Sequence, residues 1–432
     1  MPEPQTPLSQ RPWEDVERLL TVDGALVRVL DTIEPTGAIC LPLRAARGLI
    51  LHAAVIAPEN VPPFRNSAMD GYAVIGEDTS NASSDAPIAL RVIGAIAAGD
   101  APSMRVTHGE AVRIMTGAPM PEGADAVVRF EETDEDSSGV RPDRDRVMVV
   151  RASESWDNVR PAGEDIALGS QMLPGGRLLR PADLGMLAAV GITSVVVHRR
   201  PRVAILSTGD EVQDPDAVLP PGAIRDSNAT TLAAMAESWG AEVQTLGIAR
   251  DRLADLSERL ASAAGADLIV SSGGVSLGDF DIVKDALRAS GDISIWQVRM
   301  KPGKPLAFGT IGHAPFLGLP GNPVAAAVSF QVFGRPAVRK MLGHADIGPV
   351  VVQARLLEEV DNRGMRRHYV RALVERGEDG IWTARTAGSQ GAGVLSSLSR
   401  ANALLVISET VDRAETGSVH PAMLLDSGDL GN

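Results

Sequence analysis

The stretch ADLIVSSGGVSLGDFD, residues 266–281, decides the fold of the most legible part of the chain. An apolar run of strand length leads directly into two glycines, a serine and acidic residues. That order is typical of a buried parallel strand whose carboxyl end opens into a ligand-binding loop. Strand, polar loop and helix continue to alternate over residues 201–342, which predicts a parallel α/β sheet covered on both faces.

The elements of this region follow from apolar spacing and from the residues that end a helix. Leu232, Met235 and Trp239 have helical spacing, and Gly240 ends that helix. After His344 the sequence turns to short β-type runs, which predict a C-terminal β-barrel-like domain. We expect strands at 202–207, 242–248, 266–272, 294–300, 305–309 and 314–320, and helices at 228–239, 253–260, 279–290 and 323–342.

The N-terminal half has a different pattern. Short β-type runs separated by Gly, Pro and Asp fill residues 62–150. Helical spacing precedes them, with stripes at 26–30 and 43–50, and mixed sequence follows at 162–198. Because helix-containing sequence flanks the β-rich segment on both sides, we expect that segment to be an insertion. The predicted domains are a disordered tail (1–11), a discontinuous mixed helical linker domain (12–61 with 151–198), the inserted β-rich domain (62–150), the α/β domain (199–343) and the C-terminal β domain (344–432).

Composition narrows the function classes. The 432 residues suggest roughly three domains at about 150 residues each. A net charge of −14 opposes nucleic-acid binding, which needs a basic face. The single cysteine, Cys40, allows no internal disulfide. The apolar run at 184–197 is too short to span a bilayer, and the first ten residues lack a signal-peptide pattern. We therefore expect a cytoplasmic protein that binds neither membrane nor nucleic acid.

Polar loops follow the predicted strands, and a parallel sheet gathers such loops at one edge. Glycines let backbone N–H groups approach phosphate oxygens, and lysines add positive charge. Asn322 and Pro323 begin a helix whose free N–H groups face the same edge. Acids beside a phosphate make sense only with a hard cation such as Mg²⁺ between them. The sequence thus predicts an anion site with a divalent metal, drawn from Thr208, Gly209, Asp210, Glu211, Asp251, Gly273, Gly274, Ser276, Asp281, Lys301, Lys304, Pro320, Gly321 and Asn322.

Simpler interpretations stay open for several of these features. Asp251 stands where a helix begins and fits an N-cap, and the two glycines at 273–274 fit a plain turn. Asp70 and Gly71 fit a hairpin turn, and the acids at 131–136 fit a solvated face.

Two sequence motifs bear on catalysis, the P-loop and the G-x-S-x-G motif. Gly303 and Lys304 are followed by Pro305, so the chain has no P-loop. Residues 274–278, GVSLG, match the G-x-S-x-G pattern, which would make Ser276 the nucleophile of a serine hydrolase. No HGGG-type oxyanion segment precedes this motif, so the hydrolase is a minor alternative. The histidines show no paired metal-ligand spacing.

Longer strings carry a family resemblance. They are PPFRNSAMDGYAV (62–74), RIMTGAPMPEGADAVV (113–128), GEDI (163–166), STGDE (207–211), SSGGVSLGDFD (271–281), MKPGKPLAFG (300–309), LPGNPVAA (319–326) and SQGAGVLSSLSRANALLV (389–406). Together and in this order they resemble molybdopterin molybdenumtransferase, the MoeA family, to which the E domain of gephyrin also belongs. The resemblance extends from about Thr21 to His420.

The resemblance implies a fold, a reaction and a set of site residues. The fold is an elongated four-domain homodimer, with a molybdopterin-binding α/β domain and a cleft shared between subunits. The reaction inserts molybdenum from molybdate into the dithiolene of adenylylated molybdopterin and releases AMP. Asp70 and Thr116 would act on the partner's site, while Arg366, in an R-x-x-[FY]-x-R context, would admit molybdate. The residues that match functional family positions are Asp70, Thr116, Asp165, Glu211, Asp251, Asp281 and Lys301, and Gly273, Gly274, Ser276, Lys304, Pro320, Gly321 and Asn322 fit the loops that hold the pterin and its phosphates.

The chain departs from relatives at four positions. Gln297 stands where some relatives carry a basic residue, and Arg65 replaces an acid. Ala325 and Ala392 replace small hydroxyl residues, which weakens a serine-based molybdate site there.

We hypothesise that Mg²⁺, held by Glu211, Asp251 or Asp281, makes AMP a better leaving group. Lys301 and Lys304 would position molybdate and the terminal phosphate. A scaffold function of the same dimeric fold, as in gephyrin, is the alternative from another class.

Overall fold

The computed structural model describes residues 19–135, 143, 145–250, 252–273 and 291–425. The chain divides into two compact units. One consists of Met1–Ile39 with Val196–Asn432, and the other is Cys40–Val195. The predicted helix at 279–290 and the predicted tail at 1–11 lie outside the described residues.

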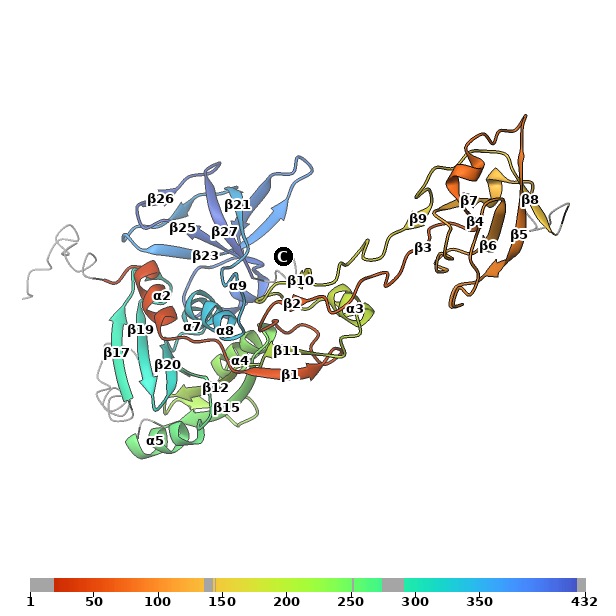
Figure 1. The fold of residues 1–432 in the computed structure, drawn as a ribbon. Helices are drawn as coiled ribbons and strands as arrows, with labels where there is room; N and C mark the ends of the chain where they lie inside the picture. Colours follow the sequence, from red (N-terminus) through yellow and green to blue (C-terminus); the bar gives the residue numbers. More distant parts are fainter. Residues whose placement is uncertain (1–18, 136–142, 144, 251, 274–290, 426–432) are drawn as a thin grey trace, which may run out of the picture. The chain divides into compact units, whose positions relative to one another are not determined.

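A six-stranded sheet forms the centre of the first unit (Figure 1). Its strands in spatial order are β15 (Glu242–Ala249), β12 (Arg202–Thr208), β16 (Leu268–Ser272), β20 (Ala314–Leu319), β19 (Pro305–Ile311) and β17 (Gly291–Gln297). The first four run parallel to their neighbours, and β19 runs antiparallel to both β20 and β17. The predicted multidomain α/β fold with a parallel sheet is confirmed, with β19 as the one reversed strand of this sheet.

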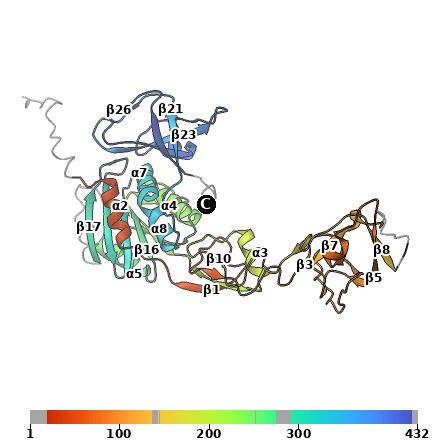
Figure 2. The ribbon, with the colours of Figure 1, turned by 45° about the horizontal axis from the view of Figure 1, so that its top comes forward.

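Helices cover both faces of this sheet (Figure 2). They are α2 (Val22–Asp31), α4 (Asn228–Ser238), α5 (Leu253–Ser262), α7 (Pro323–Ser329), the π-helical turn η4 (Phe330–Gly334) and α8 (Arg335–Met341). On one face, Leu256 and Leu260 of α5 pack against Ala204 and Leu206 of β12. Alternate residues of a strand point to opposite faces, so the equally buried Ile205 faces the other layer, where α4 and α7 contact the sheet and each other.

The C-terminal part is a small closed barrel. Its strands are β21 (Val351–Leu356), β23 (Arg367–Arg376), β24 (Trp382–Thr386), β25 (Ala403–Ile407) and β27 (Val419–Leu424), and the β23–β25 pairing closes the ring. Helix α9 (Leu395–Arg400) packs against β23. The short strand β18 (Met300–Lys301) pairs in parallel with the start of β23, so the chain that links β17 to β19 reaches the barrel.

The second unit contains a five-stranded sheet in the order β7-β4-β6-β5-β8. These strands are β4 (Gly71–Val74), β5 (Ile88–Ile96), β6 (Glu110–Ile114), β7 (Ala126–Arg129) and β8 (Arg146–Val149). The chain enters along β3 (Asn66–Ser67) and leaves along β9 (Val159–Arg160), which pair antiparallel. The β-runs predicted within 62–150 are confirmed, and the domain boundaries stay predictions.

The remainder of this unit is mixed, as predicted. It contains β2 (Val55–Ile56), its antiparallel partner β10 (Gln171–Leu173) and the helix α3 (Pro181–Ala189). Strand β1 (Ala38–Pro42) pairs with β11 (Ser194–His198).

Three local interpretations of the sequence were wrong. Two of them concern turns, and the third concerns the acids at 131–136. Residues 43–50 form turns rather than a helix, because Gly48 takes a left-handed φ of +75° and donates its N–H to Leu179. Asp70 and Gly71 do not form a hairpin turn, since β3 pairs with β9 and β4 pairs with β6 and β7.

The acids at 131–136 are not simply a solvated face. Glu135 is buried, with its carboxylate accepting from Arg113 Nη2 at 2.7 Å and from the Tyr72 hydroxyl. Glu132 is buried as well and accepts from Arg129 Nη2 at 2.6 Å.

Within the described residues, no helix has both the length and the apolar character that a membrane crossing requires.

Candidate active site

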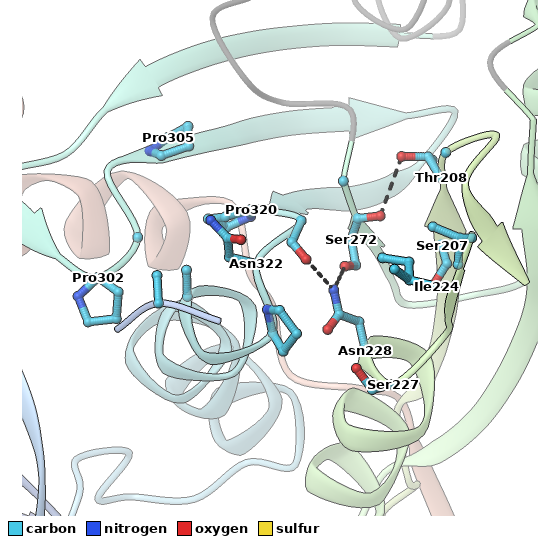
Figure 3. A pocket seen from close by; sticks show the side chains of 18 of the residues that line it. Ser207, Thr208, Ile224, Ser227, Asn228, Ser272, Pro302, Pro305, Pro320 and Asn322 are labelled. Carbon is cyan, nitrogen blue, oxygen red and sulfur yellow. Dashed lines mark hydrogen bonds between the residues drawn. The ribbon is translucent and has the colours of Figure 1, made fainter. Parts of the chain in front are cut away.

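A cavity of about 840 Å³ opens at the carboxyl ends of β12, β16 and β20. Figure 3 shows its lining from close by. The strand-end loops contribute the residues at 207–212, 272–273 and 320–323, and the chain between β17 and β19 contributes 301–305. The barrel side adds Arg366 and the residues at 390–392. The predicted gathering of loops at one sheet edge is therefore present in the fold.

Most of the residues predicted for this edge line the cavity. They are Thr208, Gly209, Glu211, Gly273, Lys301, Lys304, Pro320, Gly321, Asn322 and Arg366. Asp210 is not among the lining residues, although its carbonyl accepts from Arg250 Nη1 at 2.9 Å. Asp251, Gly274, Ser276 and Asp281 lie outside the described residues.

Two glycines let the loops approach one another closely. Gly273 has φ +95°, and a Cβ there would stand 2.7 Å from the carbonyl oxygen and the hydroxyl of Thr208. Gly303 has φ +103°, and its Cβ would stand 2.4 Å from Ser329 Oγ. Both conformations and both approaches require glycine, so the cavity wall is built on backbone at these points.

Asn228 ties three loops together beside the cavity (Figure 3). Its Nδ2 donates to Ser272 Oγ at 2.6 Å and to Gly321 O at 2.8 Å. The start of α4 is thereby joined to the ends of β16 and β20. Thr208 Oγ1 adds a bond to Ser272 O at 3.3 Å.

Lys301, Lys304 and Arg366 supply positive charge to the lining. Burial, then the neighbouring Arg366 and Arg371, lower the pKa of the Lys301 ammonium, and Asp361 offsets part of this effect. Cations gathered at one site repel one another, and a bound anion relieves that repulsion. Within the described ranges, none of these three side chains forms a salt bridge.

Acidic groups reach the cavity at Glu211 and Asp226. The Glu211 carboxylate lies against Gly209, where a Cβ would stand 2.6 Å from its Oε2. Asp226 is buried and accepts the Ala229 N–H at 2.9 Å, so it serves the start of α4. In the parts of the chain that the structure describes, no cluster of three or more His, Cys, Asp and Glu side chains could hold a metal ion.

The helix that begins at Pro323 has Asn322 as its N-cap, as predicted. Its N–H groups are not all free, because the Val324 N–H donates to Ala392 O at 3.1 Å. The expectation of free N–H groups at this helix start was therefore wrong for Val324. Ala325 and Ala392 both line the cavity with methyl groups.

The other predicted site residues belong to the unit Cys40–Val195. Asp70 Oδ1 accepts from the Thr116 backbone N–H at 2.7 Å and from its hydroxyl at 2.8 Å. These bonds lower the pKa of the Asp70 carboxyl, so it stays ionised and fixed in direction. Asp165 is exposed, and its backbone N–H bonds to Val61 O.

Sequence reasoning did not identify Asn228, Ser272 or Gln390 as part of the site. Asn228 follows a strand-end loop and opens a helix, which is the position where such an edge gathers polar groups. That signal was present in the sequence. Gln390 lies within the string 389–406 that carried the resemblance, but nothing in its local pattern marks it.

Three family models match the chain in succession. They are the MoeA N-terminal region (domain I and II) over residues 20–191, a probable molybdopterin binding domain over 204–340, and the MoeA C-terminal region (domain IV) over 353–425.

Individual relatives match over nearly the whole length. A molybdopterin molybdenumtransferase of Nostoc sp. is 39% identical over 414 residues, covering 94% of this chain and 93% of the relative. That of Haemophilus influenzae is 34% identical over 409 residues, covering 93% and 98%. Among solved structures, a molybdopterin biosynthesis MoeA protein from Pyrococcus horikoshii has a TM-score of 0.83 at 30% identity and covers 95% of this chain and 100% of its own.

Proposed function

The chain belongs to the MoeA family, and on that premise we propose that it is a molybdopterin molybdenumtransferase. Its role is in molybdenum cofactor biosynthesis. In the proposed reaction, molybdenum from molybdate enters the dithiolene of adenylylated molybdopterin and AMP leaves.

One observation carries the proposal: Lys301, Glu211 and Gly273 line the same cavity. A lysine, a carboxylate and a glycine loop at one sheet edge are what a phosphate-bearing substrate needs. The cavity of about 840 Å³ also falls in the size range of small-molecule sites, about 300–1,000 Å³.

The cations that line the cavity would hold anionic substrates in place. Lys301 and Lys304 would position molybdate and the terminal phosphate of the pterin, with Arg366 admitting molybdate from the barrel side. Fixed charges of this kind stabilise developing negative charge without reorganising during the reaction.

The donor set suits a magnesium ion that is shared with the substrate. Mg²⁺ is commonly held by one or two carboxylates together with substrate phosphates. Glu211 offers a carboxylate turned back over the backbone of Gly209, and Asp251 and Asp281 complete the proposed ligand set. A magnesium ion held there would supply positive charge to the pyrophosphate-like linkage, which would make AMP a better leaving group.

We further propose a cytoplasmic homodimer with a shared active site. Asp70 of the partner subunit and Thr116 of the partner subunit would reach this cavity, and Asp165 completes the proposed catalytic set. The support is that the exposed Asp70 carboxylate is ionised and is held in direction by two hydrogen bonds from Thr116, which is exposed as well.

The test is reconstitution from purified components. Protein, molybdate, Mg²⁺ and adenylylated molybdopterin should yield AMP and a cofactor that activates a molybdenum-free apoenzyme. A scaffold, or a serine hydrolase acting through Ser276, would produce neither, and that result would rule the proposal out.

A further inference from the structure

Arg371 carries a charge that the mechanism above does not use. Its side chain is fully buried on β23, with 0% of its surface exposed. No acidic side chain pairs with it among the residues that the structure describes. Burying a guanidinium without an acidic partner is strongly unfavourable, so we expect its contacts to serve a function that offsets this cost.

The guanidinium holds a loop of the cavity wall. Arg371 Nη2 donates to Ser389 O at 3.2 Å and to Gly391 O at 3.1 Å, and Nε donates to Ser397 Oγ at 3.2 Å. The Arg371 backbone adds two bonds to the Gln390 side chain, at 2.9 and 3.1 Å. Arg371 therefore bonds to three consecutive residues of the loop at 389–392, and residues 390–392 of that loop line the cavity.

Peptide geometry then fixes where the N–H groups of this loop point. In a trans peptide the N–H is directed opposite to the C=O. The carbonyls of Ser389 and Gly391 point at the guanidinium, so the N–H groups of Gln390 and Ala392 point away from it. Neither N–H finds an acceptor among the described residues.

We propose that Arg371 is a positioning residue for a tetrahedral oxyanion: it orients the 389–392 loop so that the N–H groups of Gln390 and Ala392 face the anion in the cavity. The idea rests on the proposed function for the identity of that anion as molybdate. These backbone donors would let a wall with methyl groups at Ala325 and Ala392 bind an oxyanion.

Electrostatics supports the same assignment. Arg371 lies close enough to Lys301 to contribute to lowering the pKa of that lysine. Its charge therefore acts on the cavity itself, although its side chain is not among the lining residues. Arg371 Nη1 has no hydrogen-bond partner within the described part of the chain, so part of its charge is left for the loop peptides and the bound anion.

The test uses tungstate, a tetrahedral dianion, titrated into the full-length protein by calorimetry. Arg371→Met should weaken tungstate binding by about tenfold or more, since it removes both the charge and the loop anchor. Arg371→Lys should restore part of the affinity, because it keeps the charge without the planar fork. Arg385→Met is the matched control: Arg385 is an exposed arginine of the adjacent β24 and pairs with Glu375. The affinity of Arg385→Met for tungstate should stay within about twofold of the wild-type affinity.

A purely structural role predicts a different pattern. Arg371→Met would then lower the melting temperature while its folded fraction bound tungstate as tightly as the wild type, and that result overturns the inference. If Arg371→Met does not fold, Ser397→Ala removes one anchor and should weaken tungstate binding by about fivefold. Unchanged affinity in Ser397→Ala overturns the inference as well.

Turnover separates this inference from the proposed function. In the reconstituted reaction, Arg371→Met should raise KM for molybdate and leave KM for adenylylated molybdopterin unchanged. If the wild-type protein makes no AMP but binds tungstate, and Arg371→Met loses that binding, the proposed function is refuted and the inference stands. Wild-type protein that turns over but binds no tungstate would refute the inference alone.

Discussion

Lys301 and His368 stand directly opposite each other where β18 pairs in parallel with β23. The lysine of the cavity is thus carried on a two-residue strand that the barrel holds in register. His368 is buried, and its ring nitrogens have no hydrogen-bond partner among the residues that the structure describes. The position of the Lys301 charge therefore depends on how β18 packs on the barrel strand β23.

Lys301→Ala should abolish molybdenum insertion while leaving the fold intact. The backbone pairing of β18 does not need the side chain, whereas the anion loses a nearby charge. The measurement is AMP formation and cofactor activation, alongside the melting temperature. Lys340→Ala is the control, because Lys340 donates to Leu30 O from α8 and does not line the cavity. Wild-type rates in Lys301→Ala would remove Lys301 from the mechanism.

His368 should make the protein acid-sensitive. Burial, with Lys301 and Arg371 nearby, lowers the pKa of His368 to about 3, against about 6.5 in an unfolded chain. Between these values the unfolded state binds a proton that the folded state does not, so stability falls as pH drops from about 6.5 toward 3. Over this range, each unit by which the pH falls lowers the free energy of unfolding by up to about 1.4 kcal/mol.

His368→Gln should flatten this dependence, since glutamine does not titrate. The measurement is the urea midpoint of both proteins at a series of pH values. Parallel curves for the two proteins would show that His368 does not cause the acid sensitivity.

Gly273→Ala should lower the free energy of unfolding by more than the strain of its left-handed backbone alone would. The left-handed φ costs about 1–2 kcal/mol for a residue with a Cβ, and the contact with Thr208 adds to that. Gly265→Ala is the matched control, with φ +86° and no heavy atom within 4 Å of its Cβ. Chemical unfolding should show the larger loss in Gly273→Ala, and only that variant should lose turnover. Equal losses of stability would mean that the loops adjust freely around the new methyl group.

Glu211→Gln should raise the Mg²⁺ concentration needed for half-maximal AMP release by about tenfold or more. The amide keeps the shape of the side chain but lacks the charge that attracts the cation. Asp214→Asn, an exposed acid nearby in sequence that does not line the cavity, should leave the requirement unchanged. An unaltered Mg²⁺ dependence in Glu211→Gln would exclude this carboxylate as a ligand.

Much of the fold could be predicted because its signals are local. The run from Arg202 to Thr208 reads as a buried strand, and Leu256 and Leu260 have the spacing of a helix that packs on it. The loops that follow such strands are placed by topology, so Lys301 and Gly273 could be assigned to one edge from sequence alone.

The errors have a common physical source, which is pairing between residues far apart in sequence. Leu49 is buried and helically spaced, yet Gly48 bonds to Leu179 and prevents a helix. Glu135 looks solvated in sequence and is buried because Tyr72 and Arg113 come to it from other strands. No local pattern contains those partners.

The unpredicted parts of the site have the same explanation. Asn228 matters through Ser272 and Gly321, which lie 44 and 93 positions away. The buried charge of Arg371 becomes visible only when its position behind the 389–392 loop is known.

The most direct test of the central claim is a crystal structure with AMP and tungstate, in which anomalous scattering locates the tungsten. We expect the tungsten peak beside Lys301, Lys304 and Arg366, with the AMP phosphate near Gly273 and Glu211. Tungsten and AMP bound at separate surfaces, with this cavity occupied by neither, would contradict it.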